Sequence, residues 1–250
     1  MSDLLTGGAF MLQTGFLGVL SLISSFVQAV TGFGFGIIMM AVMPMILDYQ
    51  ACLAVSAILS LVLNAVILWP VRRHVDWKQL WLPCLFCLMG TSFGLFLMRT
   101  NPSPIYKRML GVFLILLAVW LYFFSDRVRI RPTLASAGIA GLISGVCGGL
   151  FSVNGPPMVL YFISVIEDKK RYMATLQCYF LINNVYVLTV RFLTHMIPSG
   201  VGTATAWAMG GLLIGSLLGN RLFRSIDGGK LKGIVYIFMA VAGAWIAING

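Results

Sequence analysis

Long apolar runs separated by short polar gaps constrain the fold of this sequence more than any other feature. Most runs match the about 20 residues that a helix needs to cross a bilayer. Only 10% of the residues are charged and 60% are hydrophobic, whereas soluble domains are about 25% charged. We therefore predict an all-α polytopic membrane protein in which residues 1–250 form a single membrane domain. The apolar runs span approximately residues 9–30, 33–47, 50–70, 79–98, 106–125, 133–152, 157–166, 173–194, 200–220 and 233–249.

An internal repeat divides this domain into two halves. Residues 63–66 (LNAV) recur as residues 182–185 (INNV), and the Gly-x-x-x-Gly pattern of residues 90–94 recurs at residues 211–215. Small residues at this spacing are typical of close helix packing in membranes, and we assign both patterns mainly to packing.

The two short apolar runs, 33–47 and 157–166, occupy corresponding places in the two halves. Each follows a full-length run across a Gly- or Pro-rich interruption. The sequence thus predicts repeat 1 over about residues 9–125 and repeat 2 over about residues 133–249.

The distribution of basic residues indicates how the two repeats are oriented. If each short run makes a single pass, the loops on the two sides carry 10 and 7 Lys and Arg residues. If each short run instead returns toward the side from which its preceding run came, the division is 13 to 4, as the positive-inside rule requires. The prediction is two inverted repeats of four helices each, the first helix of each repeat being broken or re-entrant.

This arrangement predicts a multi-pass protein of the cytoplasmic (inner) membrane with both termini on the non-cytoplasmic side. The net charge of +10 then reflects loop residues that set orientation. The expected partner is the lipid bilayer and not a nucleic acid. A homodimer through a Gly-rich face is compatible with the sequence.

The two interruptions are the strongest candidates for a binding site, because irregular backbone at membrane depth persists only where it is buried or lines a wet cavity. The helix N-termini that follow them are suited to anions. The alternative is that their glycines only allow tight helix packing. The candidate residues are Gln28, Thr31, Gly32, Phe33, Gly34, Phe35 and Gly36 in the first half, and Ser152, Asn154, Gly155 and Pro156 in the second.

Polar side chains inside the following apolar runs extend this candidate site. Asn64 and Asn183 recur at the same repeat position, with Asn184 beside the latter and Gln177 nearly two turns earlier. These amides either contact the substrate or bond neighbouring helices. Arg191 is the only cation well inside an apolar run, and intramembrane charge is a functional candidate, although a long basic side chain can also snorkel outward.

Several classes of site are excluded. All seven acidic residues fall in loops or at the ends of apolar runs, whereas proton-coupled carriers commonly keep an acid or a histidine within the membrane. No phosphate-binding loop, nucleophile–base pair or zinc motif is present. We therefore expect no catalytic residues, no metal site, no cofactor and no enzymatic activity.

The interruptions also carry a family resemblance. The segment Thr31-Gly-Phe-Gly-Phe-Gly36 leading to Pro44, and Gly148-Gly149 leading to Pro156-Pro157, resemble the sulfite exporter TauE/SafE family, also described as toluene sulfonate uptake permeases. The resemblance implies a secondary transporter or facilitator of small sulfur-containing anions such as sulfite and sulfonates. Since a negative-inside potential expels anions at about 2.3 kcal/mol per charge and 100 mV, we expect export or facilitated flux.

A different function remains open from the residues alone. Cys147 and Cys178 lie near the proposed site and are compatible with a non-transporting membrane redox or assembly component that handles sulfur. Buried cysteine is, however, usually an inert small apolar residue.

Overall fold

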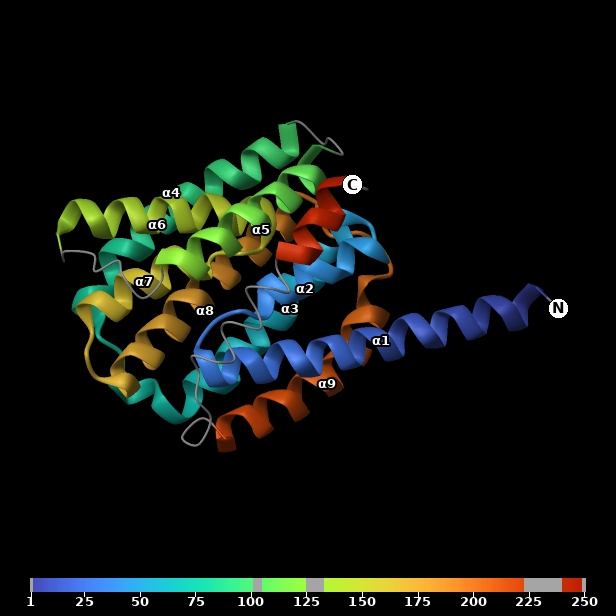
Figure 1. Ribbon diagram of the computed structural model, residues 1–250, viewed down its shortest axis with the longest axis horizontal. Helices are drawn as coiled ribbons and strands as arrows, with labels where there is room; N and C mark the ends of the chain where they lie inside the picture. Colours follow the sequence, from blue (N-terminus) through green and yellow to red (C-terminus); the bar gives the residue numbers. More distant parts are fainter. Residues whose placement is uncertain (1, 101–104, 125–132, 223–239, 249–250) are drawn as a thin grey trace.

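The computed structural model describes residues 2–100, 105–124, 133–222 and 240–248, and every regular element in them is helical. The long helices lie side by side in a bundle (Figure 1). They are α1 (Ser2–Thr31), α2 (Phe35–Val42), α3 (Tyr49–Leu68), α4 (Trp77–Thr100), α5 (Ile105–Phe124), α6 (Leu134–Phe151), α7 (Gly155–Val165), α8 (Lys169–Leu193) and α9 (Val201–Leu222), with short 3-10 helices at Met43–Met45 (η1) and Trp69–His74 (η2). Residues 240–248 are also helical.

Within these residues, six helical segments are long and apolar enough to cross a membrane. The chain is therefore a multi-pass helical membrane protein, as predicted. The predicted run 233–249 lies partly outside the described residues. The six segments are Thr14–Thr31, Tyr49–His74, Trp77–Thr100, Leu134–Phe151, Lys169–Leu193 and Val201–Leu222, and the shorter apolar helices are Phe35–Met45 and Gly155–Val165.

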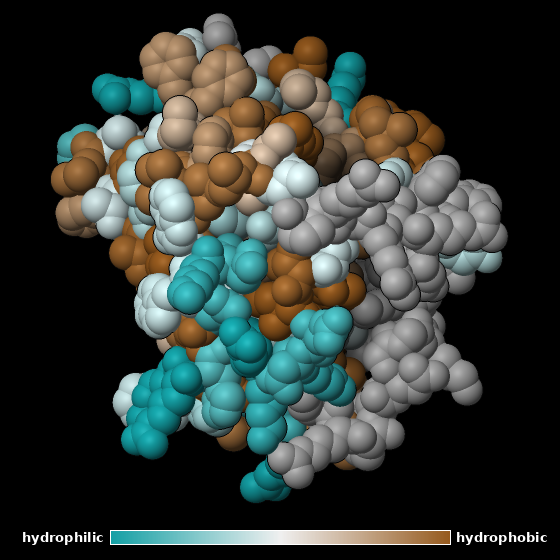
Figure 2. Space-filling model, turned by 90° about the vertical axis from the view of Figure 1, so that its left-hand side faces the viewer, coloured by the Kyte–Doolittle hydropathy of each residue, from teal (hydrophilic) through white to brown (hydrophobic). Residues whose placement is uncertain are grey.

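The outer surface is apolar along the helices and polar at one end. Large hydrophobic side chains such as Phe96, Leu116 and Leu217 are exposed, as expected where lipid tails replace water. Hydrophilic side chains gather on the end where η2 leads into α4 and α7 leads into α8 (Figure 2). These exposed charged residues include Arg72, Arg73, Lys78, Glu167, Asp168, Lys169, Lys170 and Arg171.

Glycines allow two helix pairs to approach closely. A side chain at Gly90 or Gly94 of α4 would collide with backbone carbonyls of α6, and a side chain at Gly211 or Gly215 of α9 would collide with those of α1. Accordingly, α4 packs along α6 and α9 along α1. The predicted packing role of both Gly-x-x-x-Gly patterns is confirmed.

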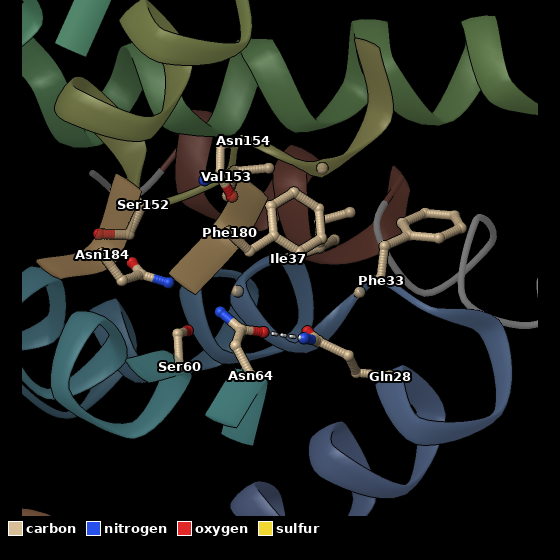
Figure 3. Close-up of a pocket in the computed structure, with 13 residues that line it drawn as sticks. Gln28, Phe33, Ile37, Ser60, Asn64, Ser152, Val153, Asn154, Phe180 and Asn184 are labelled. Carbon is tan, nitrogen blue, oxygen red and sulfur yellow. Dashed lines mark hydrogen bonds between the residues drawn. The ribbon is translucent and has the colours of Figure 1, made fainter. Parts of the chain in front are cut away.

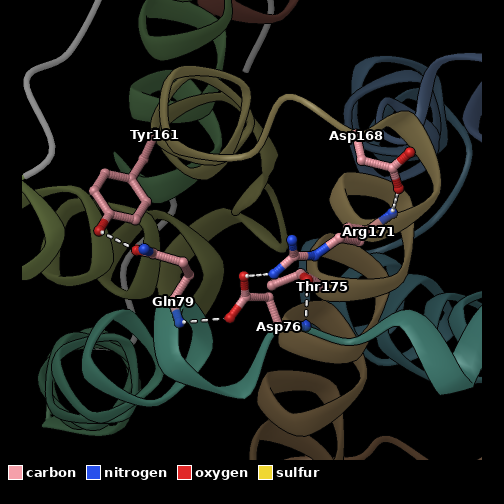
Figure 4. A network of polar contacts seen from close by, with 6 residues as sticks. All are labelled: Asp76, Gln79, Tyr161, Asp168, Arg171 and Thr175. Carbon is pink, nitrogen blue, oxygen red and sulfur yellow. Dashed lines mark hydrogen bonds and ion pairs between the residues drawn. The ribbon is translucent and has the colours of Figure 1, made fainter.

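A polar network joins the helices at the hydrophilic end (Figure 4). The Arg171 guanidinium forms an ion pair with Asp76 over 2.6 Å, and the backbone N–H of Asp76 donates to Thr175. The Tyr161 hydroxyl donates to Gln79 over 3.4 Å. The start of α4 is thereby tied to α7 and to the first turns of α8.

Candidate functional site

The first break separates α1 from α2 at residues 32–34. Gly32 and Gly34 have φ angles of 89° and 114°, a region that side chains with a Cβ rarely adopt. The Thr31 hydroxyl lies 2.9 Å from the Val27 carbonyl oxygen and 2.6 Å from that of Phe33. The two glycines let the chain turn, and the Thr31 hydroxyl lies between a carbonyl of α1 and a carbonyl of the turn.

Gln28 fixes the first break to the surrounding helices. Its side-chain oxygen Oε1 accepts from the Phe35 backbone N–H at the start of α2, over 3.2 Å. Its amide nitrogen donates to Asn64 on α3 over 2.6 Å and to Gln177 on α8 over 3.3 Å. Gln177 in turn donates to the Gly32 carbonyl over 2.7 Å. Two helices thus hold this break through buried amides.

The second break separates α6 from α7 at residues 152–154. Here the left-handed residue is Ser152, with φ of 53°, and not a glycine. The Ser144 hydroxyl donates to the Asn154 backbone carbonyl, and the Tyr179 hydroxyl donates to Ser144 over 2.9 Å. This break is held through its backbone, which leaves the side chains of Ser152 and Asn154 directed elsewhere.

The two breaks meet around a small cavity (Figure 3). A Cβ at Gly36 would collide with the Ser152 carbonyl, so the start of α2 touches the second break directly. The cavity leaves about 20 Å³ for the centre of a water molecule, which is room for about one or two waters. It is lined by Gln28, Phe33, Gly34, Gly36, Ile37, Ser60, Asn64, Ser152, Val153, Asn154, Gly155, Phe180 and Asn184.

The polar groups around this cavity are uncharged. Asn154 and Ser152 lie on one side, and Asn64 and Ser60 on the other (Figure 3). Within the described part of the chain, the side-chain amides of Asn154 and Asn184 make no hydrogen bond that would occupy them. Amide N–H groups in an enclosed space stabilise a negative charge without a counter-charge, so the arrangement can hold a small anion.

The two helix N-termini at the cavity differ in the backbone N–H groups that they offer. Pro156 and Pro157 carry no backbone N–H. Before Met158, the first turn of α7 therefore offers only the backbone N–H of Gly155. The Phe35 N–H at the start of α2 is already bonded to Gln28. Gly36 and Ile37, in the same first turn, also line the cavity, and the first N–H groups of a helix have no intrahelical partner. Donors for an anion therefore come from this turn of α2 as well as from amide side chains.

Nine of the predicted site residues line the cavity, and seven do not. Thr31, Gly32, Phe35 and Gln177 belong to the hydrogen bonds of the first break. Asn183 points away from the cavity, and its side-chain oxygen accepts from Thr91 over 2.8 Å and from Cys87 over 3.4 Å. The predicted residues outside the lining are Thr31, Gly32, Phe35, Pro156, Gln177, Asn183 and Arg191.

Arg191 is fully buried and does not snorkel outward. One terminal nitrogen donates to the Gly149 carbonyl, in the last turn of α6, over 3.3 Å. The other donates to the Gln50 side chain over 3.5 Å. Nε has no hydrogen-bond partner.

Four lining residues were not identified from the sequence. Two of them could have been, because residues four apart share a helix face: Ser60 precedes Asn64 by one turn on α3, and Phe180 precedes Asn184 by one turn on α8. Ile37 and Val153 are ordinary apolar residues that carry no sequence signal.

The cysteines lie apart from this cavity. All five are free and buried, and none of them lines it. Cys147 instead borders a separate apolar pocket between α5, α6 and α7. Among the described residues, no group of three or more His, Cys, Asp or Glu side chains is placed to hold a metal ion.

Comparison with known proteins gives two matches of consequence. The family model "Sulfite exporter TauE/SafE" matches residues 17–246. The "Probable sulfite/organosulfonate exporter TauE" of Cupriavidus necator is 26% identical over 257 aligned residues, which cover 92% of this chain and 96% of that protein. No solved structure matches.

Proposed function

This chain belongs to the sulfite exporter TauE/SafE family of membrane transporters, which are not enzymes, and we propose that it carries small sulfur-containing anions across the cytoplasmic membrane. The substrate class is sulfite, sulfonates and related C2 sulfur compounds. The relative from Cupriavidus necator is described as a probable sulfite/organosulfonate exporter, which supports this class. The proposed binding site is the cavity between the two breaks, near the membrane midplane.

The observation that carries the proposal is the chemistry of this cavity. Asn64, Asn154 and Asn184 bring amides to it, and no carboxylate is found among the buried side chains of the described residues. Buried acids would repel an anion at close range. Phe33 and Phe180 add an apolar wall that suits an organic tail.

We further propose that the two halves are inverted repeats. Each break spans three residues. The helices that follow the breaks, α2 and α7, begin 120 positions apart, at Phe35 and Gly155. The next helices, α3 and α8, also begin 120 positions apart, at Tyr49 and Lys169. The first helix α1 runs from right to left in Figure 1, whereas its counterpart α6 runs from left to right. Such repeats commonly place a transport site between their discontinuous helices.

The size of the cavity indicates how transport would proceed. Room for about one or two waters is less than a sulfonate group requires, so the substrate needs the breaks to separate. The contact of Gly36 with Ser152 is where this separation would begin. Alternating movement of the two halves would then expose the cavity to each side in turn.

Orientation and direction follow from charge. The end that carries the exposed basic residues of η2 and of the α7–α8 connection would face the cytoplasm, with both termini on the opposite side. With no carboxylate among the buried side chains of the described residues to couple transport to protons, the membrane potential would drive anions outward. Export or facilitated flux is therefore the proposed direction.

The test is current from purified protein in proteoliposomes adsorbed to a solid-supported membrane. Sulfite, taurine, sulfoacetate, sulfate and chloride are applied in turn, with radiotracer counterflow to detect electroneutral exchange. We expect a saturable response to sulfur anions that Asn184→Ala weakens. Thr189→Ala is the matched control, because Thr189 is exposed on the same helix and bonds only its own helix backbone among the described residues. Silence in both assays would refute the substrate class.

A further inference from the structure

The proposed anion cavity has no charged residue in its lining. Uncharged N–H donors favour an anion over a neutral ligand through charge-assisted hydrogen bonds, and a fixed positive charge nearby would strengthen this preference. Arg191 is the only charged residue among the buried side chains of the described ranges. Its position relative to the cavity therefore matters for selectivity.

The positive charge of Arg191 is uncompensated. A guanidinium stays protonated in proteins, and its partners are the Gly149 carbonyl, the Gln50 amide oxygen and, at 3.9 Å, the Met98 sulfur. Among the described residues, the ion pair that forms joins Arg171 to Asp76. No carboxylate of these residues lies within ion-pair distance of Arg191. An unpaired buried charge is costly, and in a membrane it is a mark of function.

Two observations place Arg191 near the cavity. Arg191 follows Asn184 by seven residues on α8, which is two turns along the same face and about 10 Å. Gly149, which accepts from Arg191, lies in the last turn of α6, three residues before the cavity residue Ser152 in the second break. The guanidinium thus lies close to the cavity without lining it.

We propose that Arg191 determines the charge selectivity of the cavity through its electric field, as a positioning and electrostatic residue that does not contact the substrate. This inference rests on the proposed anion transport. A unit charge about 10 Å away at an effective dielectric constant of about 20 changes anion affinity about tenfold per unit of substrate charge.

A structural role of Arg191 would behave differently. If the guanidinium only caps the last carbonyls of α6, its loss would loosen the second break and weaken all ligands by the same factor. A field instead acts in proportion to the charge of the ligand. The ratio between a monoanion and a dianion separates the two roles.

The experiment measures half-saturation in radiotracer exchange at zero membrane potential for methanesulfonate, a monoanion, and for sulfite at alkaline pH, where it is a dianion. For Arg191→Gln we expect weakening of about tenfold for the monoanion and about a hundredfold for the dianion. Arg191→Lys keeps the charge and should keep the ratio of the two affinities. Arg72→Gln is the matched control, because Arg72 is exposed in η2 and stacks on Trp69, so both affinities should stay unchanged.

A second variant keeps the test valid if Arg191→Gln does not fold. Gln50→Glu places a carboxylate beside the guanidinium and cancels its charge while Arg191 remains. The same charge-dependent weakening is expected. Equal weakening of monoanion and dianion in these variants would overturn the field role, whereas an absence of exchange by the unmodified protein would refute the proposed transport itself.

Discussion

The two breaks of this protein share their length but are held in different ways. In the first, the side chain of Gln28 is saturated by Phe35, Asn64 and Gln177, and glycines take the left-handed positions. In the second, Ser152 takes the left-handed position, and the backbone of the break is fastened by Ser144. The polar side chains of the first break are used in hydrogen bonds that hold the fold, whereas the Asn154 side chain of the second break is left to face the cavity.

The comparison assigns different tasks to similar polar residues. Substitutions in the first break should reduce folding stability before they change affinity. Substitutions of the side chains of the second break should reduce affinity with little effect on stability. The following variants test this division, in decreasing order of expected effect.

The largest effect is expected where the two breaks touch. Gly36→Ala places a methyl group against the Ser152 carbonyl, a backbone atom that cannot rotate away, and overpacking of this kind costs about 3 kcal/mol. The midpoint of thermal unfolding in detergent and the transport activity should both fall. Gly210→Ala on α9 has open space around it and should leave both unchanged. A stable, active Gly36→Ala protein would show that the breaks are not in contact.

Gln28→Leu should be the next most damaging change. It leaves the Phe35 N–H and the Asn64 oxygen without their buried partner, at a cost of about 2 kcal/mol. Ser24→Ala, one turn earlier on α1, removes only a bond within the helix and should cost less. We expect a lower midpoint of thermal unfolding for Gln28→Leu. An unchanged midpoint together with lost substrate affinity would show that Gln28 binds the substrate and does not hold the fold.

Asn154→Ala and Asn183→Ala should have opposite signatures. Asn154→Ala removes an unoccupied amide from the cavity and should weaken anion affinity about tenfold, with unfolding unchanged. Asn183→Ala removes the acceptor of Thr91 and Cys87 and should lower stability instead. Half-saturation of transport and thermal unfolding distinguish the two. The reverse pattern would contradict the placement of Asn183 outside the site.

A small net effect on stability is expected from Ser152→Gly. Glycine adopts the left-handed conformation freely, and the relief of about 1 kcal/mol is offset by about the same loss of backbone entropy. Gly34→Ala at φ of 114° makes the opposite change and should destabilise the protein by about 1–3 kcal/mol. Unfolding midpoints of the two variants test this asymmetry between the breaks. Equal destabilisation would show that Ser152 has a structural role beyond its backbone angle.

The internal repeat shows where sequence reasoning reached its limit. The LNAV and INNV segments pair Asn64 with Asn183, but the helix starts at Tyr49 and Lys169 pair Asn64 with Asn184, and it is Asn184 that faces the cavity. A shift of one residue turns a helical side chain by about 100°. Sequence similarity alone could not fix the facing direction, because both asparagines satisfy the pattern.

The sequence by itself determined the class of the protein and the location of the breaks. Apolar length is set by bilayer thickness, and glycines with the prolines after them interrupt helices through local backbone geometry, so neither depends on distant contacts. Only the tertiary structure decided which polar groups remain available. It decided whether the Gln28 side chain is fully hydrogen-bonded, whether Asn154 is unoccupied and whether Arg191 is buried without a counter-charge. Each of these depends on side chains that the fold brings together from helices far apart in the chain, because hydrogen bonds and electric fields depend on the distances between groups.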